Sequence, residues 1–279
     1  MYKIRDAGVK GLGVFAATTI PRGTRILAEH PLFTVKSERD VYAKARKLDN
    51  EDKDWLTQLS IDTKKRPTVL DIANSSWNLI RNGISPSSDA IREHDTVQAV
   101  FRNNNFDIGD GTQALFRDIC RVNHSCVPNG QGNFNKGIGK FTIHAVRPID
   151  NEEEITISYL DEHGAPKHSR QSKLSDGYGF DCSCPICESG TELSRKSEER
   201  RMNLRKMLFE HAQRMPTDDK DDHEKGLKVL QALIELFEND GLAGRELSTM
   251  LDCYFITLSG MYLCLTDNYI GTWQRRKLS

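Results

Sequence analysis

The side chains best suited to chemistry are concentrated in one polar segment, Arg121–Asn129. Its nine residues offer amide groups at Asn123 and Asn129, an imidazole at His124 and a thiol at Cys126. Such a density of hydrogen-bonding and metal-binding groups, placed between more apolar runs, indicates a binding or catalytic site. A turn capped by its own side chains is the alternative interpretation.

A second segment offers a metal site. Cys182, Cys184 and Cys187 place three thiols within six residues, one ligand short of a closed tetrahedral zinc site. Three thiols this close in a polar loop that contains proline favour zinc over a dry cluster of reduced cysteines. Spacing alone leaves four candidates for the fourth ligand: Cys126, Cys120, His124 and His168.

The composition restricts the class of protein. At 279 residues the chain has room for one large domain or two smaller ones, and its 39 basic residues balance 40 acidic ones. This balance argues against a general nucleic-acid or membrane-surface binder. Seven cysteines, no apolar signal-peptide core and no stretch near the roughly 20 apolar residues of a membrane span predict a protein of the nucleus, the cytoplasm or both.

Local patterns predict the elements that must position these groups. Residues 1–35 read as short strands with turns, and the spacing of apolar residues from 38 to 91 is typical of short amphipathic helices. Phe141–Val146 and Glu154–Tyr159 alternate with the period of strands. The polar segment from 161 to 175 predicts a linker, and apolar stripes from about 198 to 267 predict helices.

Four segments, taken in order, resemble the SET-domain protein methyltransferases: Gly11–Ala16, Arg121–Asn129, Glu153–Tyr159 and Cys182–Cys187. The resemblance covers roughly residues 4 to 188, and the ordered set is far more specific than any one motif. The chain is most similar to short fungal-type SET proteins with a cysteine-rich post-SET segment. The related MYND-containing enzymes carry a zinc-binding insert in the first third, where this chain has no cysteine, so no MYND module is expected.

The resemblance implies an α+β fold. The β-rich SET domain would consist of small sheets around a knot-like core, in which Asn123–Asn129 packs with the strand that ends in Tyr159. The expected domains are a SET domain at 1–160 with a helical insert at about 38–110, a zinc-binding post-SET segment at 161–190 and a C-terminal α-helical domain at 191–279.

The resemblance also implies roles for individual residues. The residues expected to bind S-adenosylmethionine are Gly11, Leu12, Gly13, Asn104, Asn123, His124, Tyr159 and Phe180. Tyr159 and Tyr178 would be the catalytic residues, with Tyr178 lining the channel for the substrate lysine and Phe180 packing on the adenine. Cys126 would complete one structural zinc site with Cys182, Cys184 and Cys187.

The implied activity is transfer of a methyl group from S-adenosylmethionine to a lysine side chain of a protein, histone or non-histone, which releases S-adenosylhomocysteine. Nucleic acid and membrane are not expected as direct partners. Two alternatives are a SET-fold interaction module that has lost turnover and a SET-type enzyme that acts on a small molecule. The presence of Asn123, His124 and Tyr159 argues against loss of turnover.

One residue departs from the family pattern. Glu152 stands where the family commonly has a glycine before the paired glutamates. If the turn requires a positive φ, Asn151 is expected to adopt it, because asparagine tolerates the left-handed region better than most residues.

Overall fold

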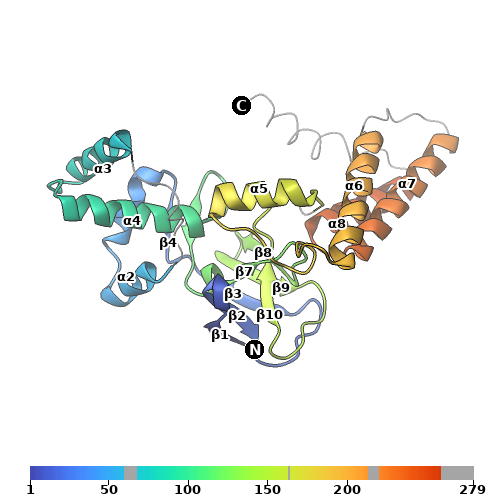
Figure 1. The fold of residues 1–279 in the computed structure, drawn as a ribbon, viewed down its shortest axis with the longest axis horizontal. Coiled ribbons are helices and arrows are strands. Elements are labelled where there is room, and N and C mark those ends of the chain that lie inside the picture. Colours follow the sequence, from blue (N-terminus) through green and yellow to red (C-terminus); the bar gives the residue numbers. More distant parts are fainter. Residues whose placement is uncertain (60–67, 163, 213–219, 259–279) are drawn as a thin grey trace. The chain divides into compact units, whose positions relative to one another are not determined.

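The computed structural model describes residues 1–59, 68–162, 164–212 and 220–258, whose elements are drawn in Figure 1. It divides into two compact units. The first unit comprises Met1–His124, Asn129–Ile157 and Lys173–Asp181, and the second comprises Ser125–Pro128, Ser158–Ser172 and the chain from Cys182 onward. The polar segment found in the sequence is therefore divided, with Asn123 and His124 in the first unit and Cys126 in the second.

A four-stranded sheet in the first unit joins the N-terminal hairpin to the polar segment. Its order is β1 (Tyr2–Asp6), β2 (Leu12–Ala16), β10 (Glu154–Ile157) and β7 (Asn123–His124). β1 and β2 are antiparallel, and β7 pairs with β10 in parallel, with Asn123 opposite Thr156 and His124 opposite Ile157. The predicted packing of the polar segment against the strand before Tyr159 is confirmed.

Two three-stranded antiparallel sheets complete the strands of the first unit that the structure describes. One has the order β3 (Arg25–Glu29), β9 (Lys140–Ala145), β8 (Gly130–Asn135), and the other β4 (Phe33–Val35), β6 (Gln113–Leu115), β5 (Phe106–Asp107). Rings of Phe106, Phe116 and Phe141 pack with centroids 4.9–5.8 Å apart. This contact joins the second sheet to the third.

Helices form an insert between β4 and β5: η2 (Glu38–Asp40), α1 (Val41–Ala45), α2 (Asn50–Thr57), α3 (Val69–Arg81) and α4 (Ser88–Asn104). The side chains of Asp49, Thr68 and Ser87 each accept a hydrogen bond from a backbone N–H of the first turn, which fixes where α2, α3 and α4 begin. The shared core of the insert and the third sheet includes Phe33, Val41, Leu56, Phe101 and Leu115. The small sheets and the insert confirm the predicted α+β SET-type fold.

The second unit contains a helical bundle. It consists of α6 (Glu192–Ala212), α7 (Lys220–Asn239) and α8 (Arg245–Leu258), coloured amber to red in Figure 1. Their apolar stripes form one core with Leu204, Leu230, Phe237, Met250 and Cys253 fully or almost fully buried. The predicted C-terminal helices are thus present as far as Leu258, and the predicted helical residues after 258 lie outside the described residues.

The prediction of a linker from 161 to 175 is wrong, because α5 spans Lys167–Tyr178. Apolar periodicity missed this helix because its buried positions include a charged residue. Arg170 and Leu174 are four residues apart and therefore share a face, and they are 1% and 0% exposed. Glu198 accepts a hydrogen bond from the backbone N–H of Lys167 at 2.8 Å, which satisfies a donor in the first turn.

The prediction that Asn151 takes a positive φ is also wrong. Glu152 itself adopts φ 68° in the turn before β10. Contacts with β1 hold it there: Arg5 donates to the Glu152 carbonyl oxygen at 3.1 Å and pairs with its carboxylate at 3.0 Å, and Lys3 forms a further ion pair. These contacts offset the roughly 1–2 kcal/mol that a non-glycine residue loses in the left-handed region.

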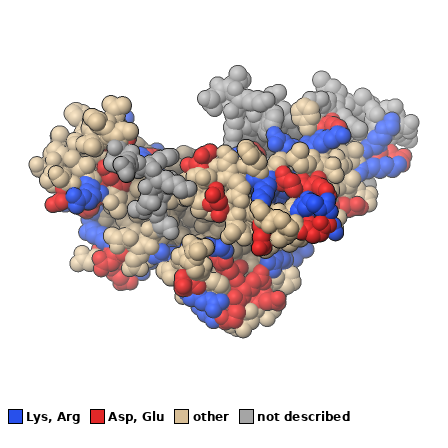
Figure 2. All heavy atoms as spheres, in the orientation of Figure 1, with Lys and Arg blue, Asp and Glu red and all other residues tan. Residues whose placement is uncertain are grey.

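Acidic and basic side chains are interspersed over the face drawn in Figure 2, in keeping with the near-zero net charge. Of the helices formed by described residues, none has both the length and the apolar character required to cross a membrane.

Candidate functional site

Asn129 fixes β10 in place beside the polar segment. Its side-chain oxygen accepts from the Thr156 backbone N–H at 2.8 Å, and its amide nitrogen donates to the Glu154 carbonyl oxygen at 2.8 Å and to Glu153 Oε1 at 3.0 Å. Asn129 is 1% exposed, so water does not compete for these bonds. The asparagine that closes the sequence motif therefore aligns β10, the strand that precedes Tyr159.

Asn123 connects β7 to the glycine turn. Its Nδ2 donates to the Leu12 carbonyl oxygen at 3.2 Å and to Glu154 Oε1 at 2.8 Å. A Cβ atom on Gly13 would lie 2.9 Å from Glu154 Oε1 and 3.0 Å from Asn123 Nδ2. Gly13 is thus needed because side chains of the site itself approach the backbone of β2.

Gly11 is needed for its conformation. It has φ 76°, a conformation that glycine adopts at little cost, and a Cβ atom there would meet nothing within 4 Å. Leu12, between the two glycines, is 40% exposed. The turn predicted to face the cofactor therefore has open space beside its backbone at Gly11.

Three predicted site residues form an aromatic cluster in the first unit. The ring of Phe180 lies 6.2 Å from that of His124 and 6.4 Å from that of Tyr178, measured between centroids. Both separations fall within the range of favourable aromatic contacts. His124 is 4% exposed, and the other two side chains are half-buried. The structure thus brings a residue of β7 together with two residues from the end of α5 and the segment after it.

Asn104 lies in the last turn of α4, and its amide nitrogen donates to the Val100 carbonyl oxygen one turn earlier at 2.7 Å. Its backbone carbonyl accepts from Cys120 Sγ at 3.3 Å. The predicted role of Asn104 in cofactor binding stays a prediction.

Tyr159 belongs to the second unit and lies two residues beyond the end of β10. The Ser158 hydroxyl accepts from the Leu160 backbone N–H and donates to the Leu160 carbonyl oxygen, both at 3.1 Å. These two bonds hold the turn on either side of Tyr159. The backbone that carries the predicted catalytic tyrosine is therefore fixed by its neighbours.

Four cysteines meet in the second unit. The sulfur atoms of Cys126, Cys182, Cys184 and Cys187 all lie within 4.8 Å of one another, and all four residues are buried. Cys126 Sγ is 3.9 Å from Cys182 Sγ and 3.6 Å from Cys187 Sγ. Zinc–sulfur bonds of about 2.3 Å in a tetrahedron require sulfur atoms about 3.8 Å apart, so this donor set fits a zinc ion.

The electrostatics of the group also favour a cation. Hydrogen bonding with Cys182 and the other thiols raises the pKa of Cys126 far above its usual range. Hydrogen bonding from Cys126 and Cys182 lowers the pKa of Cys187 to about 6. The four thiols therefore do not all ionise together, because thiolates this close repel one another. A cation among them would remove that repulsion and allow all four to be thiolates.

The other candidates for the fourth ligand lie outside this group. Cys120 accepts from the Phe116 backbone N–H at 3.4 Å in the first unit, and burial raises the pKa of its thiol to about 12. His168 is exposed, and His124 belongs to the aromatic cluster. The structure therefore favours Cys126, the ligand that the family resemblance implies.

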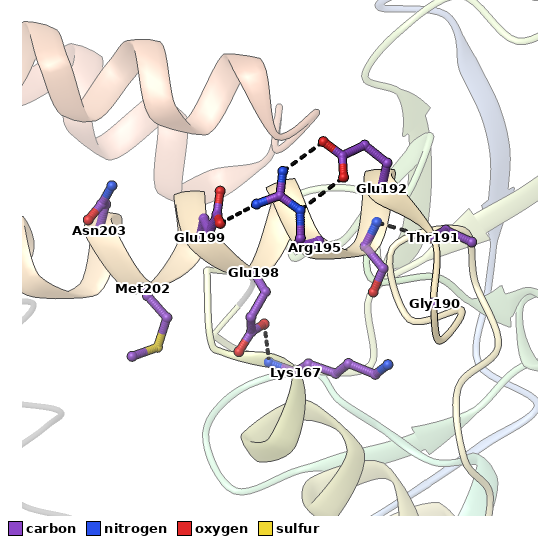
Figure 3. A pocket seen from close by; sticks show the side chains of 10 residues that line it. Lys167, Gly190, Thr191, Glu192, Arg195, Glu198, Glu199, Met202 and Asn203 are labelled. Atoms are coloured by element: carbon purple, nitrogen blue, oxygen red, sulfur yellow. Dashed lines mark hydrogen bonds and ion pairs between the residues drawn. The ribbon is translucent and has the colours of Figure 1, made fainter.

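A surface groove of about 800 Å³ runs along α6, lined among others by Lys167, Glu192, Arg195 and Glu198 (Figure 3). Its charged groups satisfy one another: Arg195 pairs with Glu192 and Glu199, and Glu198 accepts from the Lys167 backbone. None of the predicted site residues lines it. We therefore place the candidate cofactor site at the residues around β7 in the first unit and the candidate metal site at the cysteine group in the second unit.

Comparison with known families agrees with this geometry. A family model described as the SET domain matches residues 11–160, which is more than half of the chain. The chain belongs to the SET-domain family. The matched region begins at the glycine turn and ends just after Tyr159, so it includes Asn123 and His124 of β7. The family predicted from the sequence is confirmed.

Several relatives of this SET-domain chain are named as lysine methyltransferases. Histone-lysine N-methyltransferase set5 of Schizosaccharomyces pombe is 28% identical over 91% of this chain and 70% of its own length. N-lysine methyltransferase SMYD2-A of Danio rerio is 31% identical over 64% of this chain and 37% of its own. Protein-lysine N-trimethyltransferase SMYD5 of Mus musculus is 43% identical, but over only 23% of this chain and 16% of its own.

The match thus spans most of the fission-yeast relative but about a third or less of the two vertebrate relatives. The class of enzyme expected from the sequence, a protein-lysine N-methyltransferase, is the class to which these relatives belong.

Sequence reasoning missed several residues of the SET-domain chain. Glu154 accepts from Asn123 and pairs with Lys10 at 2.7 Å, so it anchors the cofactor-side asparagine. Arg170 and Arg201 are buried beside the cysteine group. A signal existed for Glu154, which is the second of the paired glutamates of the motif, but isolated arginines in polar helices carry no periodic signal.

Proposed function

We propose that this chain is an S-adenosylmethionine-dependent protein-lysine N-methyltransferase. The observation that carries the proposal is the assembly, in a SET-family chain, of Asn123 and His124 of β7 with Phe180 and Tyr178. Glu154 of the adjacent strand β10 accepts a hydrogen bond from Asn123, and Asn129 holds β10 in place through the Glu154 carbonyl oxygen. The names of the relatives support the same reaction class.

S-adenosylmethionine would supply a methyl group bonded to a positively charged sulfur. Both hydrogens of the Asn123 amide already have acceptors in Leu12 and Glu154, so its side-chain oxygen remains to accept from the ammonium group of the cofactor's amino-acid part. Phe180 would pack on the adenine, with the His124 ring beside it. The open backbone at Gly11 leaves room for a ligand.

Tyr159 and Tyr178 would act on the lysine side of the reaction. In a direct displacement, the lysine nitrogen bonds to the methyl carbon as the carbon–sulfur bond breaks, and the lysine proton leaves to water. The main requirement is alignment of the three atoms. Aromatic walls at Tyr178 and Tyr159 would desolvate the amine and lower its pKa from about 10.4, and the Tyr159 hydroxyl oxygen would orient the polarised methyl.

The cysteine group would hold one structural zinc ion. Four buried thiols leave no position open for water or substrate, which distinguishes a structural site from a catalytic one. The ion would join Cys126, two residues after His124, to the post-SET segment that carries Cys182, Cys184 and Cys187. In the domain division that we propose, 1–160 is the SET domain with its helical insert, 161–190 is the post-SET segment that supplies three of the four zinc ligands, and 191–279 is the C-terminal helical domain.

The substrate would be a protein that presents a lysine, and the relatives' names include both histone-lysine and protein-lysine enzymes. The proposal is tested by incubating the full chain with S-adenosylmethionine labelled on the methyl group and a cell extract. Labelled lysine in protein is expected, and Tyr159→Phe should abolish it. Tyr254→Phe makes the same chemical change at a tyrosine of α8 and serves as the matched control.

Two outcomes would contradict the proposal and favour an alternative. Cofactor binding without incorporation into any protein would indicate a SET-fold interaction module. Label confined to the protein-free fraction would indicate an enzyme that acts on a small molecule.

A further inference from the structure

Two arginines lie buried beside the four cysteines of the second unit. Arg170 of α5 is 1% exposed and Arg201 of α6 is 0% exposed. The guanidinium group stays protonated in proteins, so two positive charges are fixed in the interior. Burying an unpaired charge is strongly unfavourable, and each of these charges requires a compensating negative charge nearby.

Arg201 has its compensation in a carboxylate. Its Nε pairs with Asp240 Oδ2, and its Nη2 donates to the Cys126 carbonyl oxygen at 3.0 Å. Asp240 is itself buried and also accepts from Ser197 at 3.0 Å and from Arg200 at 2.9 Å. This network holds the backbone of the Cys126 loop against α6 and the end of α7.

Arg170 differs from Arg201 because its hydrogen-bond partners are a backbone carbonyl oxygen and a cysteine sulfur, and not a carboxylate. Nη1 donates to the Ala165 carbonyl oxygen, and Nη2 donates to Cys187 Sγ at 3.6 Å. Nε is buried and has no hydrogen-bond partner among the described residues. Within that part of the chain, no carboxylate pairs with Arg170, so its counter-charge must come from the cysteine sulfurs.

Formal charges around the group support this assignment. Four thiolates and a divalent ion carry two net negative charges. Buried Arg170 and Arg201 with buried Asp240 carry one net positive charge, and the partly exposed Arg200 adds a second, so these groups together balance the charge of the complete metal centre. With four neutral thiols and no ion, the same region would hold uncompensated positive charge.

We propose that Arg170 is the positioning residue that balances the charge of the metal centre through its hydrogen bond to Cys187. The inference rests on the proposed zinc site. Donation to a metal-bound thiolate lowers the electron density on sulfur, offsets repulsion among the four ligands and fixes the orientation of Cys187. Partners of this kind typically change metal affinity 10–100-fold.

The test compares the full-length parent with Arg170→Gln, Arg170→Lys and Arg195→Gln. Arg195 lies on the same helix as Arg201 but is exposed and pairs with Glu192 and Glu199 (Figure 3), so it is a matched control. Zinc affinity is measured by competition with a chromogenic chelator. The cobalt-substituted proteins report on sulfur directly through their sulfur-to-metal charge-transfer absorption.

Arg170→Gln should bind zinc about 10–100-fold more weakly than the parent. Its cobalt form should absorb at lower energy, because a sulfur without the guanidinium donor gives up electron density more readily. Arg170→Lys keeps the charge but loses the planar donor, so its affinity for zinc should fall between those of the parent and Arg170→Gln. Arg195→Gln should match the parent in both measurements.

Equal affinity and an unchanged cobalt spectrum in Arg170→Gln would overturn the inference while leaving the zinc site intact. If Arg170→Gln does not fold, Arg170→Lys decides by its cobalt spectrum, since an unchanged spectrum would show that the guanidinium does not act on sulfur. A parent protein that holds no metal would overturn the metal centre and this inference together. Zinc affinity and the cobalt spectrum do not depend on methyl transfer, so failure of this inference can be told apart from failure of the proposed enzyme activity.

Discussion

Replacing Gly13 by alanine tests the close packing at the glycine turn. The added Cβ would lie 2.9 Å from Glu154 Oε1 and 3.0 Å from both Asn123 Nδ2 and Ala7 Cβ. Ordinary contacts of a Cβ atom are about 3.4–4 Å, so neighbours on two strands must move. Overpacking of this kind typically costs about 1–3 kcal/mol.

Rotation of Asn123 and Glu154 away from β2 would relieve two of these three contacts, and the contact with Ala7 would remain. That rotation breaks the 2.8 Å hydrogen bond between them. A hydrogen bond to a charged group contributes about 1.5–3 kcal/mol, so relief costs about as much as the strain. We expect Gly13→Ala to lower the free energy of unfolding by about 2 kcal/mol and, because Asn123 shifts, to weaken S-adenosylmethionine binding at least tenfold.

Urea denaturation and calorimetric titration with S-adenosylmethionine measure the two effects. Gly226→Ala is the matched control, because Gly226 lies inside α7 and a Cβ atom there meets nothing within 4 Å. The control should stabilise its helix by about 0.5–1 kcal/mol. Gly13→Ala with parent-like stability and parent-like cofactor affinity would refute the packing described at β2, β7 and β10.

Three further changes test other parts of the account. Tyr159→Phe should lower the rate of methyl transfer about 10²–10³-fold while cofactor affinity stays within a few fold, and an equal loss of binding would contradict the assigned role. Cys184→Ser should reduce the metal content, measured by elemental analysis, well below one zinc per chain. It should also weaken cofactor binding, because the zinc ligand Cys126 follows His124 by two residues. A parent protein that is folded and free of metal would contradict the zinc site. Burial would raise the pKa of Glu153, but donors including Arg147 outweigh it and lower that pKa, so its contribution to stability is present above about pH 4.3 and is lost as the pH falls. Glu153→Gln should therefore cost about 1 kcal/mol in urea unfolding at neutral pH and little at pH 3, and an equal cost at both would disprove the ionic contribution.

The sequence could indicate a candidate site because the side chains suited to chemistry lie in short, contiguous segments. Cys182, Cys184 and Cys187 are recognisable from spacing alone, and the resemblance added Cys126 from a distant segment. The same resemblance implied that the polar segment packs with the strand before Tyr159, and the structure shows this packing as parallel pairing of β7 with β10. The alternation of apolar and polar residues predicted strands at β9 and β10, although β10 ends at Ile157 rather than at Tyr159.

The errors have specific physical causes. α5 was read as a linker because its buried face uses Arg170 beside Leu174, and hydrophobic periodicity cannot recognise a buried cation. Glu152 adopts a positive φ because Lys3 and Arg5 of a strand far away in sequence hold it. Local propensity favoured Asn151, but contacts with β1 override it.

Arginines that support the cysteine group could not be found from the sequence. Arg170 and Arg201 lie in strongly charged helices, where an arginine is expected at the surface. Their burial depends on Asp240 and on Cys187, which become neighbours only in the folded chain. Long-range charge pairing of this type leaves no local pattern.

The most direct test of the central claim is to identify the labelled atom in protein after reaction with S-adenosylmethionine. The full chain is incubated with cofactor labelled in the methyl group and with a protein extract, and the labelled peptides are sequenced by mass spectrometry. The account predicts the label on the side-chain nitrogen of lysine, and its loss when Tyr159→Phe replaces the parent. Label on another residue type, or no label in protein despite measured cofactor binding, would contradict it.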